Sequence, residues 1–306
     1  MDERWPILSS ALSNQFSFRE LSLVQEDPLL IQTERGLKKI RFWEDEHLLK
    51  QHLDWRKKLL SDDFFLDRMY ATAMGSPFIR FDRYAVTCHD APLEFAEVKG
   101  NEQIWAEMLA VFLKKSRGPA PYRQRSSVLG QAAFDYAQIE HSGLSGSETG
   151  KLVSSCFPTV RLRAEKADRL RSPYYSGNQS FILPENFSFE NNRFLMGTLF
   201  IELGQSKPIA GYPELARFFL HTALEEGEET LTALLEQLSG KRLVDQEMRN
   251  RLLAEWYDPD EWFRLAYTLN PLASLPGPDE ESQFRQIWNY KTRLIRLFEA
   301  RFPLPD

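Results

Sequence analysis

The sequence predicts an α+β fold of two lobes, an N-terminal lobe over residues 1–90 and a mainly helical C-terminal lobe over residues 91–306. Three features predict it. The first ninety residues hold several short runs in which apolar and polar residues alternate, as in half-buried strands. From about residue 101 apolar residues recur at helical spacing. One pair of strand-like runs, over residues 187–203, interrupts that helical part.

In the N-terminal lobe we expect a small antiparallel sheet and one helix. Residues 44–60 have helical spacing, with an apolar stripe that includes His52 and Trp55. Turn residues such as Asp27-Pro28 separate the strands, and Glu34-Arg35-Gly36 is typical of a hairpin connection. The predicted strands cover residues 18–24, 29–33, 37–42, 65–71, 77–81 and 84–88.

The C-terminal lobe is expected to be helical apart from its hairpin. For the hairpin we expect a strand at 187–189, a turn at 190–192 and a strand at 194–203, and we expect a flexible loop at 142–150. A sheet lobe followed by a helical lobe that holds one hairpin is the layout of the protein-kinase-like fold. The predicted helices cover residues 101–115, 128–140, 152–170, 213–225, 228–238, 243–256, 259–269 and 280–301.

The bulk composition is that of an ordinary globular protein, with 42% hydrophobic and 27% charged residues among 306. A net charge of −6 argues against nucleic acid as the main partner. No apolar run approaches the roughly 18 residues that a membrane span needs. The N-terminus MDERWPILSS lacks the basic and apolar regions of a secretory signal. We therefore expect cytoplasmic synthesis and no membrane span.

The two cysteines, Cys88 and Cys156, lie far apart and form no CxxC pair, so we expect reduced thiols. The five histidines form no HExxH pattern. Tetrahedral zinc sites need four clustered ligands, so no structural zinc is expected.

Six stretches, in order, carry a resemblance to a known family. The stretches are TERGLKKIRFWEDEHLLKQHLDWRKKLL, GSPFIRFDRYAVTC, LAVFLKKS, QSFILPENF, LFIELGQSKPIAGYPELARFF and YDPDEWFRLAYTL. With them the chain resembles the bacterial spore-coat CotS-type family, whose members look like aminoglycoside and choline phosphotransferases, over about residues 18–300. The resemblance implies a kinase-like fold, location in the spore coat, and other coat proteins as partners.

The stretch QSFILPENF falls where such phosphotransferases have a catalytic loop, His-Gly-Asp-x-x-Pro-x-Asn. Pro184 and Asn186 match that pattern, but Phe181 stands where the resemblance implies the catalytic Asp. Phenylalanine cannot accept a proton, and loss of a general base typically costs about 10²–10⁴ in rate. No intact catalytic residue is therefore expected, as in a pseudokinase.

Phosphate contacts are sought on the third strand, where kinases of this type carry a Lys. The resemblance places Arg41 at that position, and Lys39 points to the same face by strand parity. Arg binds phosphate as a planar fork, so the exchange is not conservative. Glu44 or Glu46 could pair with these cations from the following helix. A solvated strand edge is the other interpretation of these basic residues.

A metal site is sought at the two positions that hold magnesium in such enzymes. Asn186 matches one, and Glu202 stands where the resemblance implies the second Asp. Together they could form a weak remnant magnesium site. Alternatively, Asn186 stabilises a turn and Glu202 makes an internal polar contact.

The first hairpin, Val24-Gln-Glu-Asp-Pro28, contains no glycine. Backbone amides approach phosphate closely in glycine-rich loops, and Glu26 and Asp27 would repel phosphate. This sequence weighs against strong nucleotide binding.

Three functions remain open. The first is an inactive kinase-fold protein that acts in coat assembly or as an interaction scaffold. The second is an active phosphotransferase with a displaced base, for which Glu185 or Asp90 are the candidates. The third is a scaffold that binds nucleotide without transfer. ATP and magnesium are expected as cofactors only under the second and third hypotheses.

An interaction surface is sought first in two C-terminal segments, residues 255–267 and 283–298, which carry large aromatic side chains. The alternative is that these side chains cover the core of the C-terminal lobe.

Overall fold

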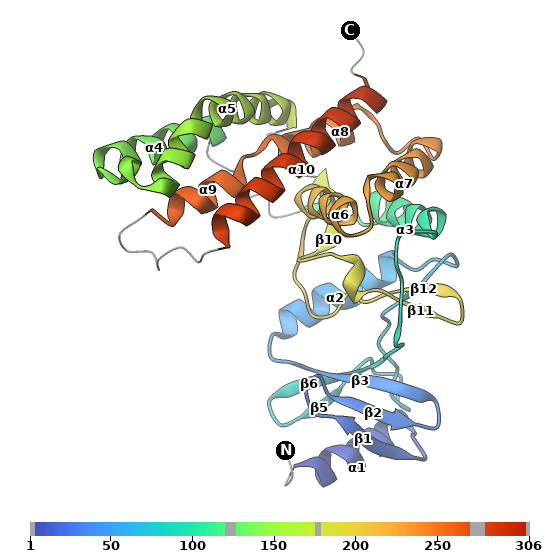
Figure 1. The fold of residues 1–306 in the computed structure, drawn as a ribbon. Coiled ribbons are helices and arrows are strands. Elements are labelled where there is room, and N and C mark those ends of the chain that lie inside the picture. The colour runs from blue at the N-terminus through green and yellow to red at the C-terminus, as the bar shows by residue number, and fades with distance from the viewer. Residues whose placement is uncertain (1–3, 120–126, 175–178, 270–278, 304–306) are drawn as a thin grey trace. The chain divides into compact units, whose positions relative to one another are not determined.

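The computed structural model describes residues 4–119, 127–174, 179–269 and 279–303 (Figure 1). The chain divides into two compact units. Unit 1 comprises Met1–Ser116 and Leu183–Ile209, and unit 2 comprises Arg117–Ile182 and Ala210–Asp306. The lobe boundary near residue 90 stays a prediction.

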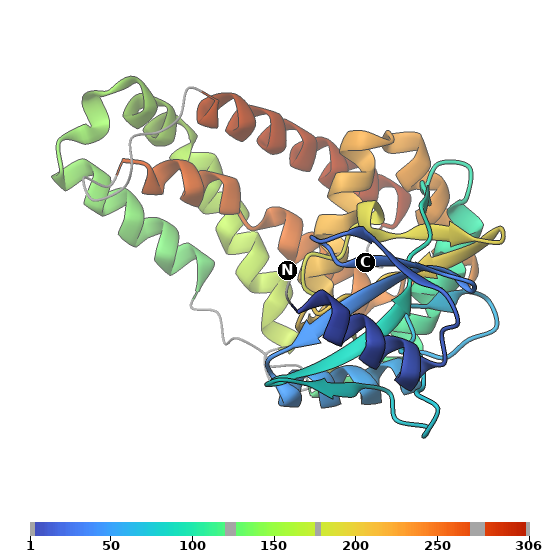
Figure 2. The same cartoon turned by 90° about the horizontal axis from the view of Figure 1, so that it is seen from below.

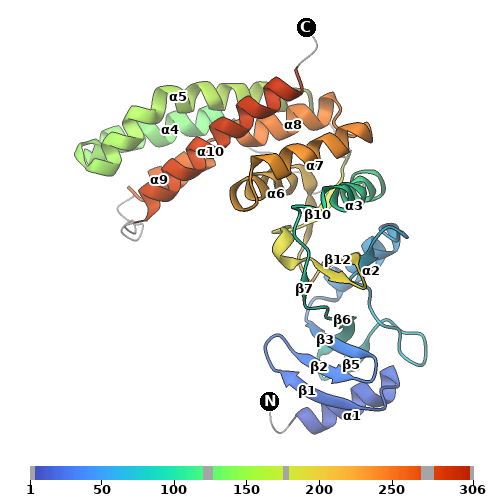
Figure 3. The same cartoon turned by 45° about the vertical axis from the view of Figure 1, so that its right-hand side comes forward.

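Unit 1 is built on a five-stranded antiparallel sheet of order β1-β2-β3-β6-β5 and a smaller sheet of order β4-β12-β11-β7 (Figure 3). Two short strands, β10 (Ile182–Pro184) and β13 (Pro208–Ala210), form a pair of their own. The other elements are α1 (Trp5–Phe16), β1 (Leu21–Gln25), β2 (Leu30–Thr33), β3 (Gly36–Trp43), α2 (Glu46–Lys58), β4 (Phe65–Leu66), β5 (Ile79–Phe81), β6 (Tyr84–Asp90), β7 (Glu94–Phe95), α3 (Glu102–Lys115), a 3-10 turn (Phe189–Asn191), β11 (Arg193–Leu195) and β12 (Thr198–Ile201).

The two faces of the larger sheet are covered differently. α1 packs its buried Leu8, Leu12 and Phe16 against Ile40 and Val86. On the opposite face, Trp43 packs with Leu49 of α2 and with Ala85. The alternation of strand residues thus sends Ile40 to one side of β3 and Lys39, Arg41 and Trp43 to the other.

Helix α1 was not expected from the sequence. Its segment WPILSSALSNQF carries no charge, and only Leu8, Leu12 and Phe16 are buried along its length. Burial of each such side chain stabilises the fold by about 1.5–3 kcal/mol. The helix therefore depends on the sheet beneath it more than on its own sequence pattern.

The expected hairpin forms, but its turn lies elsewhere. The structure has a 3-10 turn at Phe189–Asn191, and β11 and β12 are joined at Met196-Gly197. Both of these turn residues have positive φ, which glycine adopts without strain. The expected strand at 187–189 does not form, and the turn expected at 190–192 precedes β11 instead of joining the two hairpin strands. The side-chain amide of Asn192 closes that turn by donating to the carbonyl of Ser188, at 2.7 Å.

Two further expectations were wrong in extent. The expected strand at 65–71 is only β4, because the ladder with β12 ends at the bond from the Asp67 amide to Ile201, and the carbonyl of Asp67 accepts from the Arg56 side chain. The expected loop at 142–150 contains a 3-10 turn at Leu144–Gly146 and the start of α5. Ser147 caps that helix by accepting a hydrogen bond from the Gly150 amide, at 3.0 Å.

Unit 2 is mainly helical (Figure 2). Its core contains the buried side chains of Ile139, Val160, Trp262 and Phe284, which come from four helices. Among the described residues, no helix is both long enough and apolar enough to cross a membrane. The elements are β8 (Gly118–Pro119), α4 (Val128–His141), a 3-10 turn (Leu144–Gly146), α5 (Glu148–Arg171), a second 3-10 turn (Ser172–Tyr174), β9 (Gln179–Ser180), α6 (Gly211–Glu225), α7 (Glu228–Gly240), α8 (Gln246–Tyr257), α9 (Asp260–Tyr267) and α10 (Glu280–Arg301).

Both cysteines are free thiols. Cys88 is fully buried in unit 1, and this burial raises the pKa of its thiol to about 12. Cys156 is partly buried in unit 2.

Candidate functional site

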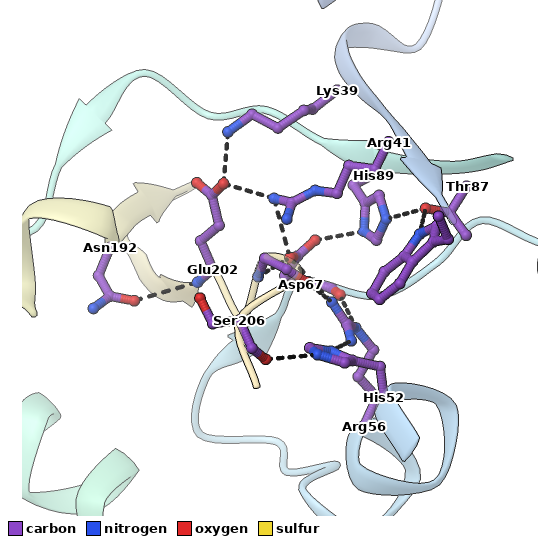
Figure 4. A network of polar contacts seen from close by, with 12 residues as sticks. Lys39, Arg41, His52, Arg56, Asp67, Thr87, His89, Asn192, Glu202 and Ser206 are labelled. Atoms are coloured by element: carbon purple, nitrogen blue, oxygen red, sulfur yellow. Dashed lines mark hydrogen bonds and ion pairs between the residues drawn. The ribbon is translucent and has the colours of Figure 1, made fainter. Parts of the chain in front are cut away.

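Two cations of β3 converge on one carboxylate (Figure 4). Lys39 Nζ and Arg41 Nη2 each lie 2.6 Å from the same oxygen, Glu202 Oε1. Lys39 and Arg41 share a face because they are two residues apart on a strand. The structure therefore brings together three of the residues singled out from the sequence.

Glu202 directly follows β12, and its amide donates a hydrogen bond to Asn192 Oδ1 at 3.3 Å. Its side chain is 22% exposed and that of Lys39 is 21% exposed, whereas that of Arg41 is 9% exposed. The ion pair is thus open to solvent on the Lys39 side and closed on the Arg41 side.

Asp67 holds Arg41 from the buried side. Its carboxylate lies 3.4 Å from Arg41 Nη2, 3.3 Å from Arg56 Nη2 and 2.5 Å from His89 Nδ1. The amide of Gly204 also donates to it, at 3.0 Å. Burial by itself would raise the pKa of Asp67, but His89, Arg41 and Arg56 outweigh that effect and hold the pKa well below its usual range.

Helix α2 contributes His52 and Arg56, four residues apart and hence on one face. Arg56 donates from Nε to the carbonyl of Asp67 at 2.6 Å, from Nη2 to that of Gly204 at 3.1 Å, and from Nη1 to His52 Nδ1. His52 Nε2 donates to the carbonyl of Ser206 at 2.8 Å, and because Nδ1 accepts from Arg56 the ring carries a single proton and is neutral. Burial, then the charge of Arg56, lower the pKa of His52 to about 3.

A chain of buried hydrogen bonds fixes His89. The indole N–H of Trp43 donates to Thr87 Oγ1 at 2.8 Å, and Thr87 Oγ1 lies 2.7 Å from His89 Nε2. If Thr87 gives its hydrogen to Nε2, His89 is neutral and its Nδ1–H faces Asp67. A neutral His89 agrees with burial, which lowers the pKa of this ring.

We call these seven residues, Lys39, Arg41, His52, Arg56, Asp67, His89 and Glu202, the Glu202 network. It contains three cationic side chains and two carboxylates. With both histidines neutral, the network carries one net positive charge. An anion of modest charge would complement it.

One expectation about its partners needs correction. Glu44 and Glu46 do not pair with the β3 cations, because Glu44 lies 3.4 Å from Arg83 and Glu46 pairs with Arg80 at the exposed edge of the sheet. Besides Glu202, the carboxylate that pairs with Arg41 is that of Asp67. The sequence did not single out Asp67, because this residue lies inside an expected strand. The sequence did contain one indication of a buried polar cluster, namely that His52 and Arg56 interrupt the apolar stripe of α2.

Asn186 lies in the turn that follows β10, with a φ of +61°. The asparagine side chain that contacts Glu202 is that of Asn192, whose Oδ1 accepts from the Glu202 amide. No group of three or more His, Cys, Asp or Glu side chains suited to a metal occurs in the part of the chain that the structure describes. A magnesium site at Asn186 and Glu202 stays a prediction.

Phe181, in unit 2, is buried against the start of α6. Its carbonyl accepts a hydrogen bond from the Gly211 amide at 2.8 Å, and its ring meets that of Tyr212 edge-on at 4.8 Å between centroids. A Cβ at position 211 would lie 2.2 Å from the Phe181 ring, so only glycine permits this packing. An apolar side chain therefore fills the position where the resemblance implies a base.

No protein-family model matches the sequence, and no curated protein matches it significantly. Among solved structures, the chain is similar to an aminoglycoside phosphotransferase from Alicyclobacillus acidocaldarius, with 13% identity and a TM-score of 0.67 over 95% of this chain and 94% of that one.

It is also similar to spectinomycin phosphotransferase in complex with ADP and spectinomycin, at 10% identity and a TM-score of 0.55 over 96% of this chain and 97% of that one. A thermostable mutant of an aminoglycoside phosphotransferase, in a ternary complex with AMP-PNP and hygromycin B, is 11% identical, with a TM-score of 0.50 over 94% and 97%. The chain therefore has the aminoglycoside phosphotransferase form of the protein-kinase-like fold.

Proposed function

We propose that this kinase-fold chain does not transfer phosphoryl groups and acts as an interaction scaffold. The observation that carries the proposal is Phe181, which is 4% exposed and packed on Gly211 at the base position implied by the resemblance. A carboxylate there would be needed to accept the proton of an acceptor hydroxyl.

The Glu202 network supports the same proposal independently. Arg41 is engaged by both Glu202 and Asp67, and Lys39 by Glu202. A nucleotide phosphate would have to displace a charge-assisted contact that the protein already makes. Glu202, in turn, is engaged by two cations that compete with a magnesium ion for its carboxylate.

The displaced-base alternative finds little support. Asp90 accepts from buried Lys38 at 2.9 Å and from the Tyr70 hydroxyl at 2.7 Å, so it already serves a structural pair. Glu185 is exposed, and its amide bonds the carbonyl of Lys207 at 2.9 Å. Neither arrangement resembles a poised base.

Nucleotide binding without transfer is a second candidate. The net positive charge of the Glu202 network and the solvent-open Lys39 favour an anionic ligand. Structural neighbours with ADP and AMP-PNP bound make such a ligand reasonable. Coat assembly with other coat proteins, which the resemblance implies, remains a prediction on either candidate.

The test is a coupled ADP-release assay of the full chain with ATP and magnesium, over hydroxyl acceptors that include spectinomycin and hygromycin B. We expect no turnover above a protein-free blank. Turnover that disappears in Asn186→Ala would overturn the proposal and favour the displaced base. A nucleotide-induced rise in melting temperature without turnover would select the second candidate.

A further inference from the structure

Helix α9 presents an aromatic ridge on its outer side. Trp262, Leu265 and Ala266 face the core of unit 2 and are buried. Phe263 and Tyr267 are one helical turn apart on the remaining surface, and Tyr267 is 67% exposed. A single exposed aromatic residue is ordinary, but a contiguous exposed apolar patch tends to mark an interaction site.

A groove lies on each side of this ridge. Between α4 and α9 there is a groove of about 630 Å³ lined by Phe134, Ile139 and the ridge itself. Between α9 and α10 there is a second, of about 460 Å³, lined by Phe284, Ile287 and the same ridge. Phe134 is 60% exposed, so the apolar surface continues beyond the first groove.

Each groove contains a carboxylate without a cationic partner among the described residues. In the first, burial raises the pKa of Asp135, and its hydrogen bond comes from the neutral Gln131, at 2.7 Å. In the second, Glu280 has a buried oxygen, Oε2, without a hydrogen-bond donor in the described part of the chain.

Among the described residues that line these grooves, the one cationic side chain, Arg264, is already paired with a carboxylate. Arg264 pairs with Asp260 at 3.3 Å on the same helix. Glu261, the third acid on the lining, is occupied by Lys291 at 2.7 Å and by Arg163 at 3.3 Å. The unmatched charge of the two grooves is therefore negative.

We propose that this face of α4, α9 and α10 binds a basic amphipathic helix of a partner protein. Apolar side chains of that helix enter the grooves on either side of the Phe263–Tyr267 ridge, and its Lys or Arg side chains reach Asp135 and Glu280. Acidic groups at the grooves select a basic partner over an acidic one. The inference rests on the proposed scaffold function and names its binding surface.

The probe is a fluorescein-labelled peptide of Leu and Lys at helical spacing, about 18 residues long, which gives five helical turns. The matched control peptide has Glu in place of every Lys. Binding to the full chain is followed by fluorescence anisotropy at about 0.15 M salt, where long-range attraction to a net-acidic protein is screened. We expect the Leu/Lys peptide to bind and the Leu/Glu peptide not to bind.

Variants then locate the contact. Tyr267→Ala should weaken binding about tenfold or more, as truncation of an aromatic anchor does. The double variant Asp135→Asn, Glu280→Gln should weaken binding of the Leu/Lys peptide. Phe95→Ala removes an aromatic residue of unit 1 with a similar exposure of 61%, and should change nothing.

Equal binding of both peptides, or unchanged binding in Tyr267→Ala and in the double variant, would overturn the proposal. Sedimentation that reveals a dimer abolished by Tyr267→Ala would overturn it too, because a second copy would then be the occupant. The peptide assay contains no nucleotide. Turnover of ATP would therefore overturn the proposed lack of catalysis without changing the peptide result. Failure of the proposed function and failure of the proposed binding surface are thus distinguishable.

Discussion

Glu202 engages both cations of β3. One of its oxygens accepts from both Lys39 and Arg41, at 2.6 Å each. A phosphate group that approached these cations would compete with a carboxylate that is tethered beside them, and a tethered group has a high effective concentration. We therefore expect the side chain of Glu202 to limit anion binding at Lys39 and Arg41.

Replacement of Glu202 by Gln tests this directly. The variant keeps the side-chain shape and removes the negative charge, so we expect tighter binding of ATP in the absence of magnesium. A tenfold gain in affinity corresponds to about 1.4 kcal/mol of extra stabilisation at saturating ligand, measured as a shift in melting temperature with EDTA present.

Exposed Glu185→Gln is the matched control, since it removes the same charge outside the Glu202 network. An equal gain in both variants would mean that overall charge, rather than release of Lys39 and Arg41, governs binding. No gain in Glu202→Gln would show that the two cations are not an anion site.

Asp67 is expected to be the most sensitive carboxylate in unit 1. It is fully buried among Arg41, Arg56 and His89, and its removal leaves two buried guanidinium groups without their shared anion. We expect Asp67→Asn to lower the free energy of unfolding by about 3–5 kcal/mol, measured by urea denaturation followed by circular dichroism.

Asp82→Asn serves as its control, because Asp82 pairs with Arg4 at 3.2 Å on the exposed surface. Exposed pairs contribute about 0–1 kcal/mol. Similar losses in both variants would contradict the central role given to Asp67.

At the scale of elements, the start of α6 depends on the absence of a side chain. Gly211 opens the helix and lies under the Phe181 ring, where a Cβ would approach ring carbons to 2.2–2.7 Å. Phe181 and the first residue of α6 therefore constrain each other. Replacement of Phe181 by a polar side chain would remove the ring that packs on this helix start.

Gly211→Ala is expected to destabilise the protein by about 1–3 kcal/mol, because overpacking outweighs the gain in helix propensity. Gly240→Ala, at the end of α7, meets nothing within 4 Å and should be neutral or stabilising by up to about 1 kcal/mol. Thermal denaturation of both variants checks the contrast. A neutral Gly211→Ala would mean that Phe181 moves readily.

At the scale of the whole molecule, two buried neutral histidines make stability depend on pH. Burial lowers the pKa of both His52 and His89, that of His52 to about 3, whereas unfolded histidine titrates near 6.5. Below about pH 6.5 the unfolded chain binds protons that the folded chain does not, so acidification favours unfolding.

The free energy of unfolding should fall by about 1.4 kcal/mol per pH unit from His52 alone as the pH drops from about 6 towards 5, and the lowered pKa of His89 should add to this fall. Urea denaturation over this range measures the slope. His52→Gln should reduce it, while His141→Gln, at the exposed end of α4, should not. An unchanged slope in His52→Gln would indicate that the ring is charged in the folded protein.

The overall fold could be predicted because periodicity is a local property of the sequence. Alternation over β1 to β3 and helical spacing over α3 to α10 each appear in short windows. Helix α1 could not be predicted this way, since its helix is stabilised by the sheet it covers. The turn of the β11–β12 hairpin was misplaced because two turn-forming segments, 190–192 and 196–197, compete in one stretch.

The site was predictable only where residues share an element or match a motif. Strand parity put Lys39 and Arg41 on one face, and a motif singled out Glu202. Asp67 and His89 come from other elements, and their meeting depends on the parallel pairing of β4 with β12 and on the β3–β6 register. Such long-range pairing leaves no trace in local spacing.

The hydrogen bond between Trp43 and Thr87 makes the Glu202 network observable by spectroscopy. The indole proton of Trp43 is buried, and the chain of contacts from it runs through Thr87 and His89 to Asp67, which touches Arg41. Its NMR signal should be resolved, slow to exchange with solvent, and displaced when an anion replaces Glu202 at Arg41. One tryptophan resonance thereby reports occupancy of a charged site that the indole itself never touches.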